Sequence, residues 1–253
     1  MMPKQAWLIF FGLSSYLAFA INQFPASTAY RWFAPSELSL AGVEGTIWSA
    51  SARLGSYEQF YFENLNWKLD PVQLLLFRIT GEIEASFLGG FISTRASFFD
   101  NQALLTSLRG GTTMSALREF LPIRGTEGQI NLDLDEVSFI DAWPTHAQGT
   151  ITLRSVAVPP LVPNSNGTLI QLGNHFITLD ETPEGGLSGS FSDQGGPIES
   201  SGSWMLNMNK DFLIEGVLKA RPSADAALIQ GINLMTSEPD EAGNREFSFA
   251  GSL

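Results

Sequence analysis

The sequence predicts a mainly β protein, with a single N-terminal transmembrane helix followed by a long, curved, largely antiparallel β-sheet body and a few short helices. Residues 6–21 are uncharged and almost wholly apolar. From residue 37 onward, segments of alternating apolar and polar residues follow one glycine after another, and a period of two is the pattern of half-buried strands. Charged residues make up only 16% of the chain, against 24 glycines and 19 phenylalanines, which favours strands and turns over solvated helices.

The N-terminal segment AWLIFFGLSSYLAFAI follows Lys4. As a helix it is about 24 Å long, slightly shorter than the roughly 30 Å hydrocarbon layer of a bilayer. Lys4 can snorkel to cover part of the difference. By the positive-inside rule, residues 1–4 are then a cytoplasmic tail, residues 5–21 a transmembrane anchor and residues 22–253 an exported body.

A cleaved signal peptide is the alternative for the same segment. Ala18-Phe19-Ala20 has the small-x-small form that a signal peptidase requires. The apolar run reaches Ala20 itself without a polar spacer, which favours the uncleaved anchor. Both alternatives export residues 22–253, so cleavage after Ala20 stays open.

Composition excludes several classes of function. The net charge is −12, with 26 acidic and 14 basic residues, so the body repels phosphate backbones and we expect no nucleic acid partner. The same charge argues against adsorption of the body onto anionic lipid. The chain has no cysteine, which excludes disulfides, thiolate metal sites and cysteine nucleophiles. An exported domain without disulfides suits a bacterial periplasm.

The alternation is clearest in residues 128–135, where Ile130, Leu132 and Leu134 are separated by polar residues. One face of such a strand is dry and the other wet, as in an antiparallel sheet. The same pattern begins at Gly45, Gly81, Gly149, Gly167, Gly202 and Gly216. Because the intervals are irregular, we expect a meander of similar strands rather than a solenoid, with glycines at the strand starts.

Short helices are expected at three places. Asp70 and Pro71 form an N-cap and first-turn pair before an apolar run. Residues 115–121 form one or two turns. Residues 223–235 are the strongest helix, capped by Ser223.

The Pro-rich residues 159–163 are the best candidate boundary inside the body. The body is expected to be continuous and to contain two similar halves that meet near residues 158–166. A crossing between two layers of one domain is the alternative explanation of the same prolines.

No group of residues predicts a catalytic, cofactor-binding or metal site. His146, in a predicted loop, and His175, in a predicted strand, have no partner at metal-ligand spacing. Asp133 and Asp135 alternate on the wet face of a strand, which favours solvated side chains over the paired carboxylates of a glycosidase. We therefore expect no enzyme and no cofactor.

A different class of function would use the apolar face of the sheet. If its large side chains interdigitate, they form a core. If they line an open groove, the protein is a periplasmic carrier of lipid or another apolar ligand. The residues that discriminate are Phe62, Phe87, Phe98, Leu132 and Trp204.

Several segments together resemble one family. They are Gly45-Thr46-Ile47-Trp48-Ser49, Trp67-Lys68-Leu69-Asp70-Pro71 with Leu74-Leu75 and Arg78, Leu121-Pro122-Ile123-Arg124-Gly125, Gly195-Gly196-Pro197, Ala220-Arg221-Pro222-Ser223-Ala224 and Phe247-Ser248-Phe249-Ala250-Gly251-Ser252-Leu253. Their order and the N-terminal membrane segment resemble protein N of the bacterial type II secretion system, over nearly the whole chain. Phe77 before Arg78 departs from the family, where a smaller residue is expected.

The resemblance implies a non-catalytic, single-pass inner-membrane protein with its body in the periplasm. Such a protein would help to assemble or stabilise the machinery that exports folded proteins across the outer membrane. Its implied partners are other inner-membrane subunits of the secretion system, which it would meet by tethering and docking. The family also resembles proteins with long curved sheets that handle lipid between bacterial membranes, an analogy that keeps lipid as a possible ligand.

Overall fold

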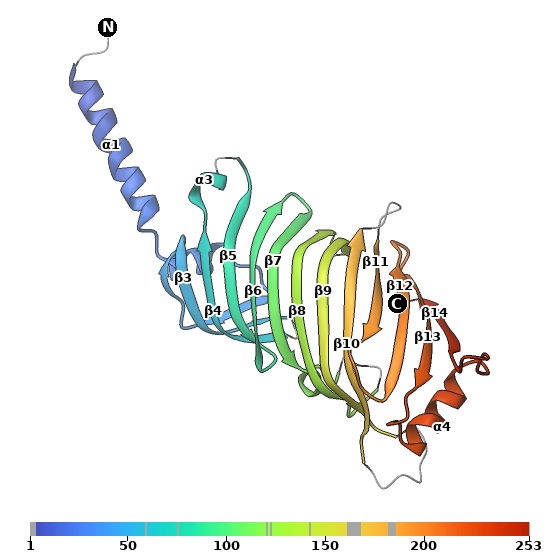
Figure 1. Ribbon diagram of the computed structural model, residues 1–253. Coiled ribbons are helices and arrows are strands. Elements are labelled where there is room, and N and C mark those ends of the chain that lie inside the picture. Colours follow the sequence, from blue (N-terminus) through green and yellow to red (C-terminus); the bar gives the residue numbers. More distant parts are fainter. Residues whose placement is uncertain are drawn as a thin grey trace. The chain divides into compact units, whose positions relative to one another are not determined.

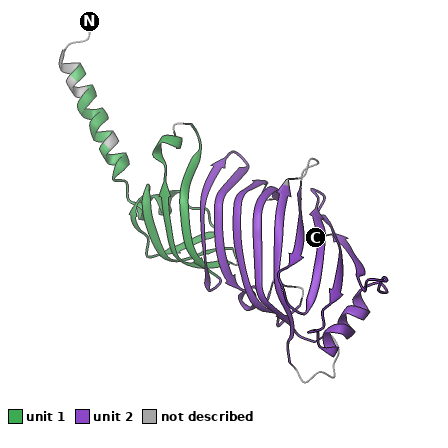
Figure 2. Ribbon diagram, viewed as in Figure 1, with its two compact units in different colours: residues 1–87 green, residues 88–253 purple. Residues whose placement is uncertain are grey.

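The computed structural model of the chain describes residues 4–58, 60–74, 76–119, 121, 123–141, 143–160, 168–181 and 186–252. The chain divides into two compact units, residues 1–87 and residues 88–253 (Figure 2). Both units are built mainly from antiparallel strands, with few and mostly short helices. The predicted fold class is confirmed to this extent.

Unit 1 joins three helices to a small antiparallel sheet. The helices are α1 (Lys4–Asn22), α2 (Ala26–Phe33) and α3 (Pro71–Leu74). The strands are β1 (Leu38–Ala41), β2 (Glu44–Thr46), β3 (Ser49–Tyr57), β4 (Phe60–Leu69) and β5 (Ile79–Phe87). They pair in the order β1-β3-β4-β5, and β2 also pairs with β3.

Unit 2 is a meander in which each strand pairs with the next one along the chain (Figure 1). Its strands are β6 (Gly90–Phe99), β7 (Gln102–Thr113), β8 (Glu127–Ile140), β9 (Trp143–Val158), β10 (Ile170–Glu181), β11 (Leu187–Asp193), β12 (Ile198–Leu206), β13 (Asp211–Ala220) and β14 (Arg245–Ser252). A 3₁₀ helix, η1 (Met114–Leu117), follows β7, and α4 (Ala226–Met235) follows β13.

The turns of the meander are tight because polar residues accept left-handed backbone angles there. Asp100 and Asp141 have φ of 53° and 50°, a region in which Asp is tolerated better than most residues. The Asp141 amide donates to the Asn101 carbonyl at 3.2 Å, and the Asn101 side chain donates to the Asp141 carboxylate at 3.1 Å. Two neighbouring turns therefore support each other.

The strand register aligns one line of residues across unit 2 from β6 to β14. The line consists of Ile92, Gly110, Leu132, Ile151, Ile177, Phe191, Gly202, Gly216 and Phe247. The line combines large apolar side chains with three glycines, and a methyl group added at Gly216 would come within 2.8 Å of the Phe191 ring. The glycines in β12 and β13 thus make room for an aromatic ring.

This use of glycine corrects the sequence interpretation. Gly149, Gly202 and Gly216 were expected at strand starts, but they lie inside β9, β12 and β13. Each of these strands begins several residues before its glycine, so the glycine occupies an interior position of a longer strand.

Two clusters of buried residues hold unit 2 together. The larger one consists of Leu108, Leu134, Val137, Ala147 and Leu179. The smaller one fixes α4 against strand ends, through Ile170, Ile198, Leu228 and Ile232. Within the described residues, no large side chain falls below 2% exposure, so the apolar face is covered only partly.

The predicted short helices are present with altered bounds. α3 begins at Pro71 as expected, and the helix expected over residues 115–121 is the 3₁₀ turn η1, which ends at Leu117; residue 120 of that range lies outside the described residues. The cap of α4 is Asp225 and not Ser223, because the Asp225 carboxylate accepts the Leu228 amide at 2.7 Å. Ser223 lies too far before the first turn to make this contact.

The N-terminal helix is present as α1. In the part of the chain that the structure describes, no helix is long and apolar enough to cross a membrane. The transmembrane anchor over residues 5–21 therefore stays a prediction, as do the halves that meet near residues 158–166. Residues 161–167 of that junction lie outside the described residues.

Candidate docking surfaces

The motif Gly45-Thr46-Ile47-Trp48 forms the turn from β2 to β3 and holds the end of α1. The Trp48 indole N–H donates to the Ile21 carbonyl at 3.0 Å, one of the last carbonyls of α1, which have no partner within the helix. The Ile47 amide donates to the Phe24 carbonyl at 3.0 Å. These bonds join the helix to the sheet of unit 1.

The motif Trp67-Lys68-Leu69-Asp70-Pro71 lies directly beside this turn. The Leu69 amide donates to the Trp48 carbonyl at 2.7 Å, and the Trp67 indole donates to the Ile47 carbonyl at 3.2 Å. Asp70 then caps α3, since its carboxylate accepts the Val72 amide at 3.0 Å. We call this region, where α1 ends, β3 begins and α3 follows β4, the junction end of unit 1.

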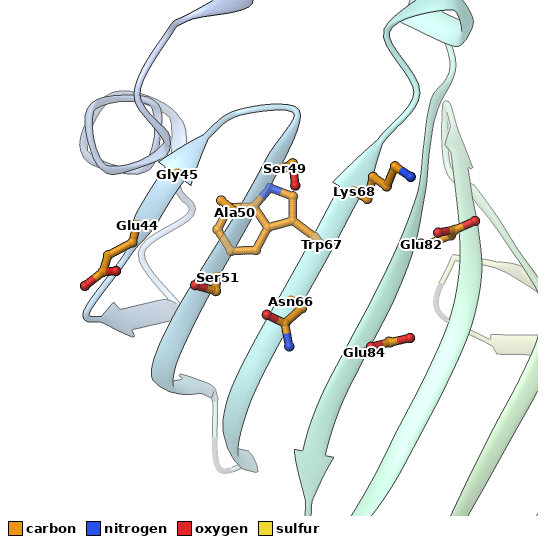
Figure 3. A pocket seen from close by; sticks show the side chains of 10 residues that line it. All are labelled: Glu44, Gly45, Ser49, Ala50, Ser51, Asn66, Trp67, Lys68, Glu82 and Glu84. Carbon is orange, nitrogen blue, oxygen red and sulfur yellow. The ribbon is translucent and has the colours of Figure 1, made fainter.

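A groove of about 440 Å³ opens between β2, β3, β4 and β5 (Figure 3). Its lining residues are Glu44, Gly45, Ser49, Ala50, Ser51, Asn66, Trp67, Lys68, Glu82 and Glu84. Three carboxylates and one ammonium give this groove a negative potential, which favours contact with cationic groups.

In unit 2, Asp193 and Arg221 form an ion pair that joins two other motifs. The Arg221 guanidinium lies 2.7 Å from the Asp193 carboxylate, whose side chain is 8% exposed. It also donates to the Gly196 and Ile198 carbonyls at 3.1 and 2.8 Å. The Arg221 amide donates to the Pro197 carbonyl at 2.8 Å. The segments 195–197 and 220–224 are therefore held together by one arginine.

Burial and hydrogen bonding act in opposite directions on Asp193. Desolvation raises the pKa of its carboxyl group. The hydrogen bonds from Arg221 and from the Ser200 and Gly195 amides, together with the guanidinium charge, outweigh desolvation and leave the pKa below its ordinary value. Asp193 is therefore held as a carboxylate.

His175 lies opposite Asp193 in the pairing of β10 with β11. Burial lowers the pKa of His175, while the Asp193 charge and a hydrogen bond with the Leu172 backbone act against this. The sequence interpretation missed this pair because the two residues are on separate strands. The other histidine, His146, lies in β9, opposite Ser138 of β8, and not in a loop as predicted.

The carboxylates considered for a glycosidase lie on a solvated face. Arg109 approaches Asp133 at 2.6 Å and Asp135 at 3.6 Å, and the two carboxylate side chains are 62% and 71% exposed. This confirms the wet strand face. Within the described residues, no group of three or more His, Cys, Asp and Glu side chains is placed to bind a metal ion.

The five residues that were to distinguish a core from a groove have different environments. Phe62 covers Gly55 in unit 1, and Phe87 packs against Phe60. In unit 2, Trp204 packs on the larger core cluster, Leu132 lies beside Gly110, and Phe98 is 45% exposed. A hollow of about 700 Å³ on β12, β13 and β14 is lined mainly by serine, glutamate and glycine, a lining that does not favour an apolar ligand.

The last motif, Phe247 to Leu253, belongs to β14 as far as Ser252, and its final residue lies outside the described residues. β14 ends the strand order of unit 2. The Ser237 amide donates to the Glu246 carbonyl at 3.0 Å, and the Glu246 amide donates to the Ser237 hydroxyl at 2.9 Å. The backbone groups of Glu246 therefore point away from β13. Alternation turns those of Ser248, Ala250 and Ser252 the same way, which leaves a strand edge for a partner.

These features define a class of protein whose sequence motifs have structural roles. The motifs stabilise turns, join α1 to the sheet of unit 1 and form the edge strand β14. Residues 36–248 match the family described as "Type II secretion system (T2SS), protein N", and the chain belongs to this family. A relative named "Type II secretion system protein N", from Aeromonas hydrophila, is 20% identical over 248 residues, which cover 95% of this chain and 96% of the relative. No solved structure matches. The resemblance inferred from the sequence is confirmed.

Replacing Arg221 tests the ion pair. Arg221→Ala leaves the Asp193 carboxylate without its partner, so we expect the free energy of unfolding to fall by about 2–4 kcal/mol. Arg154→Ala removes an exposed arginine from β9 and should change it by less than about 0.5 kcal/mol. Urea unfolding followed by tryptophan fluorescence measures both variants, and equal small losses would contradict the structural role of Arg221.

The lowered pKa of His175 predicts a pH dependence of stability. The ordinary pKa of a histidine side chain is 6.5. As the pH falls through this value, the unfolded state binds more protons than the folded state, so the free energy of unfolding should decrease between pH 7.5 and pH 5. The slope is at most about 1.4 kcal/mol per pH unit. Urea unfolding midpoints across this range should vary less in His175→Gln, and an unchanged profile would contradict the burial of His175.

Proposed function

We propose that this protein is a non-catalytic accessory component of the type II secretion system at the inner membrane. Its N-terminal helix tethers the body, and the body docks onto other membrane subunits in assembly of the machinery that exports folded proteins across the outer membrane. The observation that carries the proposal is the family match over residues 36–248. A likeness to the Aeromonas protein along nearly the whole chain supports it.

The tether is proposed from the surface of α1. Residues 5–30 contain no charged side chain, and the apolar side chains of Phe10, Phe11 and Phe19 are each at least 65% exposed. α1 has 19 residues, which gives a length of about 28 Å, slightly short of the roughly 30 Å of a hydrocarbon layer, so a span would use a snorkelling Lys4 to cover the difference. Residues 1–4 then lie in the cytoplasm, residues 5–21 in the membrane and residues 22–253 in the periplasm.

Docking is proposed at the β14 edge and the acidic surface. A partner strand that pairs with the outward groups of Ser248 and Ala250 would extend the sheet. The net charge of −12 and the acidic groove of unit 1 favour basic partner surfaces. Tethering at the membrane raises the effective concentration of the body for other membrane subunits, so a weak strand contact suffices.

Removing the anchor tests the tether. We expect a form without residues 5–21, exported by a cleavable signal, to fold as a periplasmic protein but to leave secretion at the level of the strain that lacks the protein. The reason is the loss of confinement near the membrane subunits. Circular dichroism checks the fold, and the extracellular amount of a secreted enzyme checks function. Normal secretion by this form would overturn the tethering mechanism.

A proline at the strand edge tests docking. Ala250→Pro removes an outward-facing amide while the ladder to β13 stays intact. We expect nearly unchanged thermal stability and a strong loss of secretion-system subunits in co-purification from detergent-solubilised membranes. Ala250→Thr keeps the amide and is the matched control.

Mass spectrometry of proteins and extracted lipids in the same samples separates the two classes of function. Equal recovery of subunits by Ala250→Pro and Ala250→Thr would exclude the β14 edge as the docking site. Stoichiometric lipid without any subunits would replace docking with the lipid-carrier alternative.

A further inference from the structure

The connection between β4 and β5 in unit 1 exposes a group of apolar side chains. They are Val72, Leu74, Leu76, Phe77 and Ile79, which are 63, 38, 62, 87 and 50% exposed. We call this group the α3 patch. Single exposed apolar residues are ordinary on a protein surface, whereas a contiguous group indicates a contact with another apolar surface.

The backbone turns the largest of these side chains outward. Phe77 has a φ of 57°, which is uncommon for a bulky residue. The Phe77 amide donates to the Leu74 carbonyl at 3.0 Å, and the Arg78 amide donates to the Gln73 carbonyl at 3.1 Å. The turn is therefore hydrogen-bonded, yet it leaves Phe77 87% exposed.

The α3 patch lies at the junction end, where α1 also ends. Ile21 near the end of α1 accepts the Trp48 indole N–H, and the Trp48 carbonyl accepts the Leu69 amide at 2.7 Å. α3 begins two residues after Leu69, at Pro71. A short chain of contacts thus connects the end of α1 to α3, and both elements leave the same end of the unit 1 sheet (Figure 1).

We propose that the α3 patch is a second membrane contact, which inserts its apolar side chains into the lipid interface beside the end of α1. The proposal rests on the tether proposed above, because α1 is what brings a bilayer to the junction end. A small apolar projection that enters the interface is a known mode of membrane attachment. Phenylalanine and leucine side chains are typical of the apolar face of interfacial segments, and tryptophan, as at Trp48 beside the patch, suits the boundary between headgroups and hydrocarbon.

The charge distribution favours lipid as the occupant. Residues 71–79 contain no acidic side chain and one basic side chain, that of Arg78, although the whole chain has a net charge of −12. An acidic body is repelled by an anionic membrane surface, so contact with lipid requires a projection without acidic residues. The two contacts together would fix the orientation of unit 1 on the membrane, which a single helix cannot do alone.

The absence of cysteine in the chain makes site-specific labelling direct. Phe77→Cys places one thiol at the tip of the α3 patch. Glu58→Cys is the matched control, because Glu58 is also exposed, has a φ of 51° and lies at the opposite end of β3 and β4. Phe10→Cys, within α1, reports on the tether separately.

Each full-length variant is labelled with an environment-sensitive fluorophore and reconstituted into phosphatidylethanolamine–phosphatidylglycerol vesicles, with and without doxyl-labelled lipid. We expect a blue shift and strong quenching at position 77 and neither at position 58. Quenching at position 10 without quenching at position 77 would overturn the second contact and leave the tether standing. Loss of quenching at both positions would overturn the tether and the inference together. Quenching at position 58 equal to that at position 77 would show non-specific adsorption and would also overturn the inference.

Discussion

Backbone pairing between consecutive antiparallel strands is the constraint on which the rest of this structure depends. In unit 2 the register carries one line of residues from Ile92 in β6 to Phe247 in β14. A slip of one residue would move apolar side chains to the wet face. Gly202 lies opposite Phe191 and Gly216 lies opposite Gly202. These glycines fix the register, since a Cβ atom at either position would collide with the Phe191 ring. Side-chain packing and hydrogen-bond register therefore specify the same arrangement.

The motifs that mark the family acquire a physical meaning through this pairing. They are separate in sequence and meet in pairs: Trp48 with Leu69 at the junction end, and Gly196 with Arg221 in unit 2. At the junction end the Trp67 indole also donates to the Ile47 carbonyl, and in unit 2 the Arg221 guanidinium donates to the Gly196 and Ile198 carbonyls. Such bonds satisfy backbone carbonyls, which destabilise a fold when they are buried without a partner. Such residues hold the scaffold, and the contacts proposed for partners lie beside them, at the β14 edge and the α3 patch.

The two proposed modes of attachment use different chemistry. Lipid contact at the junction end would depend on apolar side chains, and its strength would scale with the apolar area removed from water. Strand pairing at β14 would depend on backbone groups and tolerate many partner side chains. Two members of a family that are only 20% identical can share both modes of attachment, because neither mode requires a particular set of reactive side chains.

The alternating pattern in residues 128–135, the apolar N-terminal helix and the cap-proline pair at Asp70 and Pro71 are local signals, and the sequence alone determined these elements. It also determined the antiparallel class, because only such a sheet leaves one face wet. Tertiary structure decided that Asp225 caps α4, that His175 faces Asp193 and that Trp48 holds the end of α1. The physical reason is distance along the chain. The Trp48 and His175 contacts join residues that only strand pairing or a turn brings together, and the α4 cap depends on the backbone angles at which the chain enters the helix.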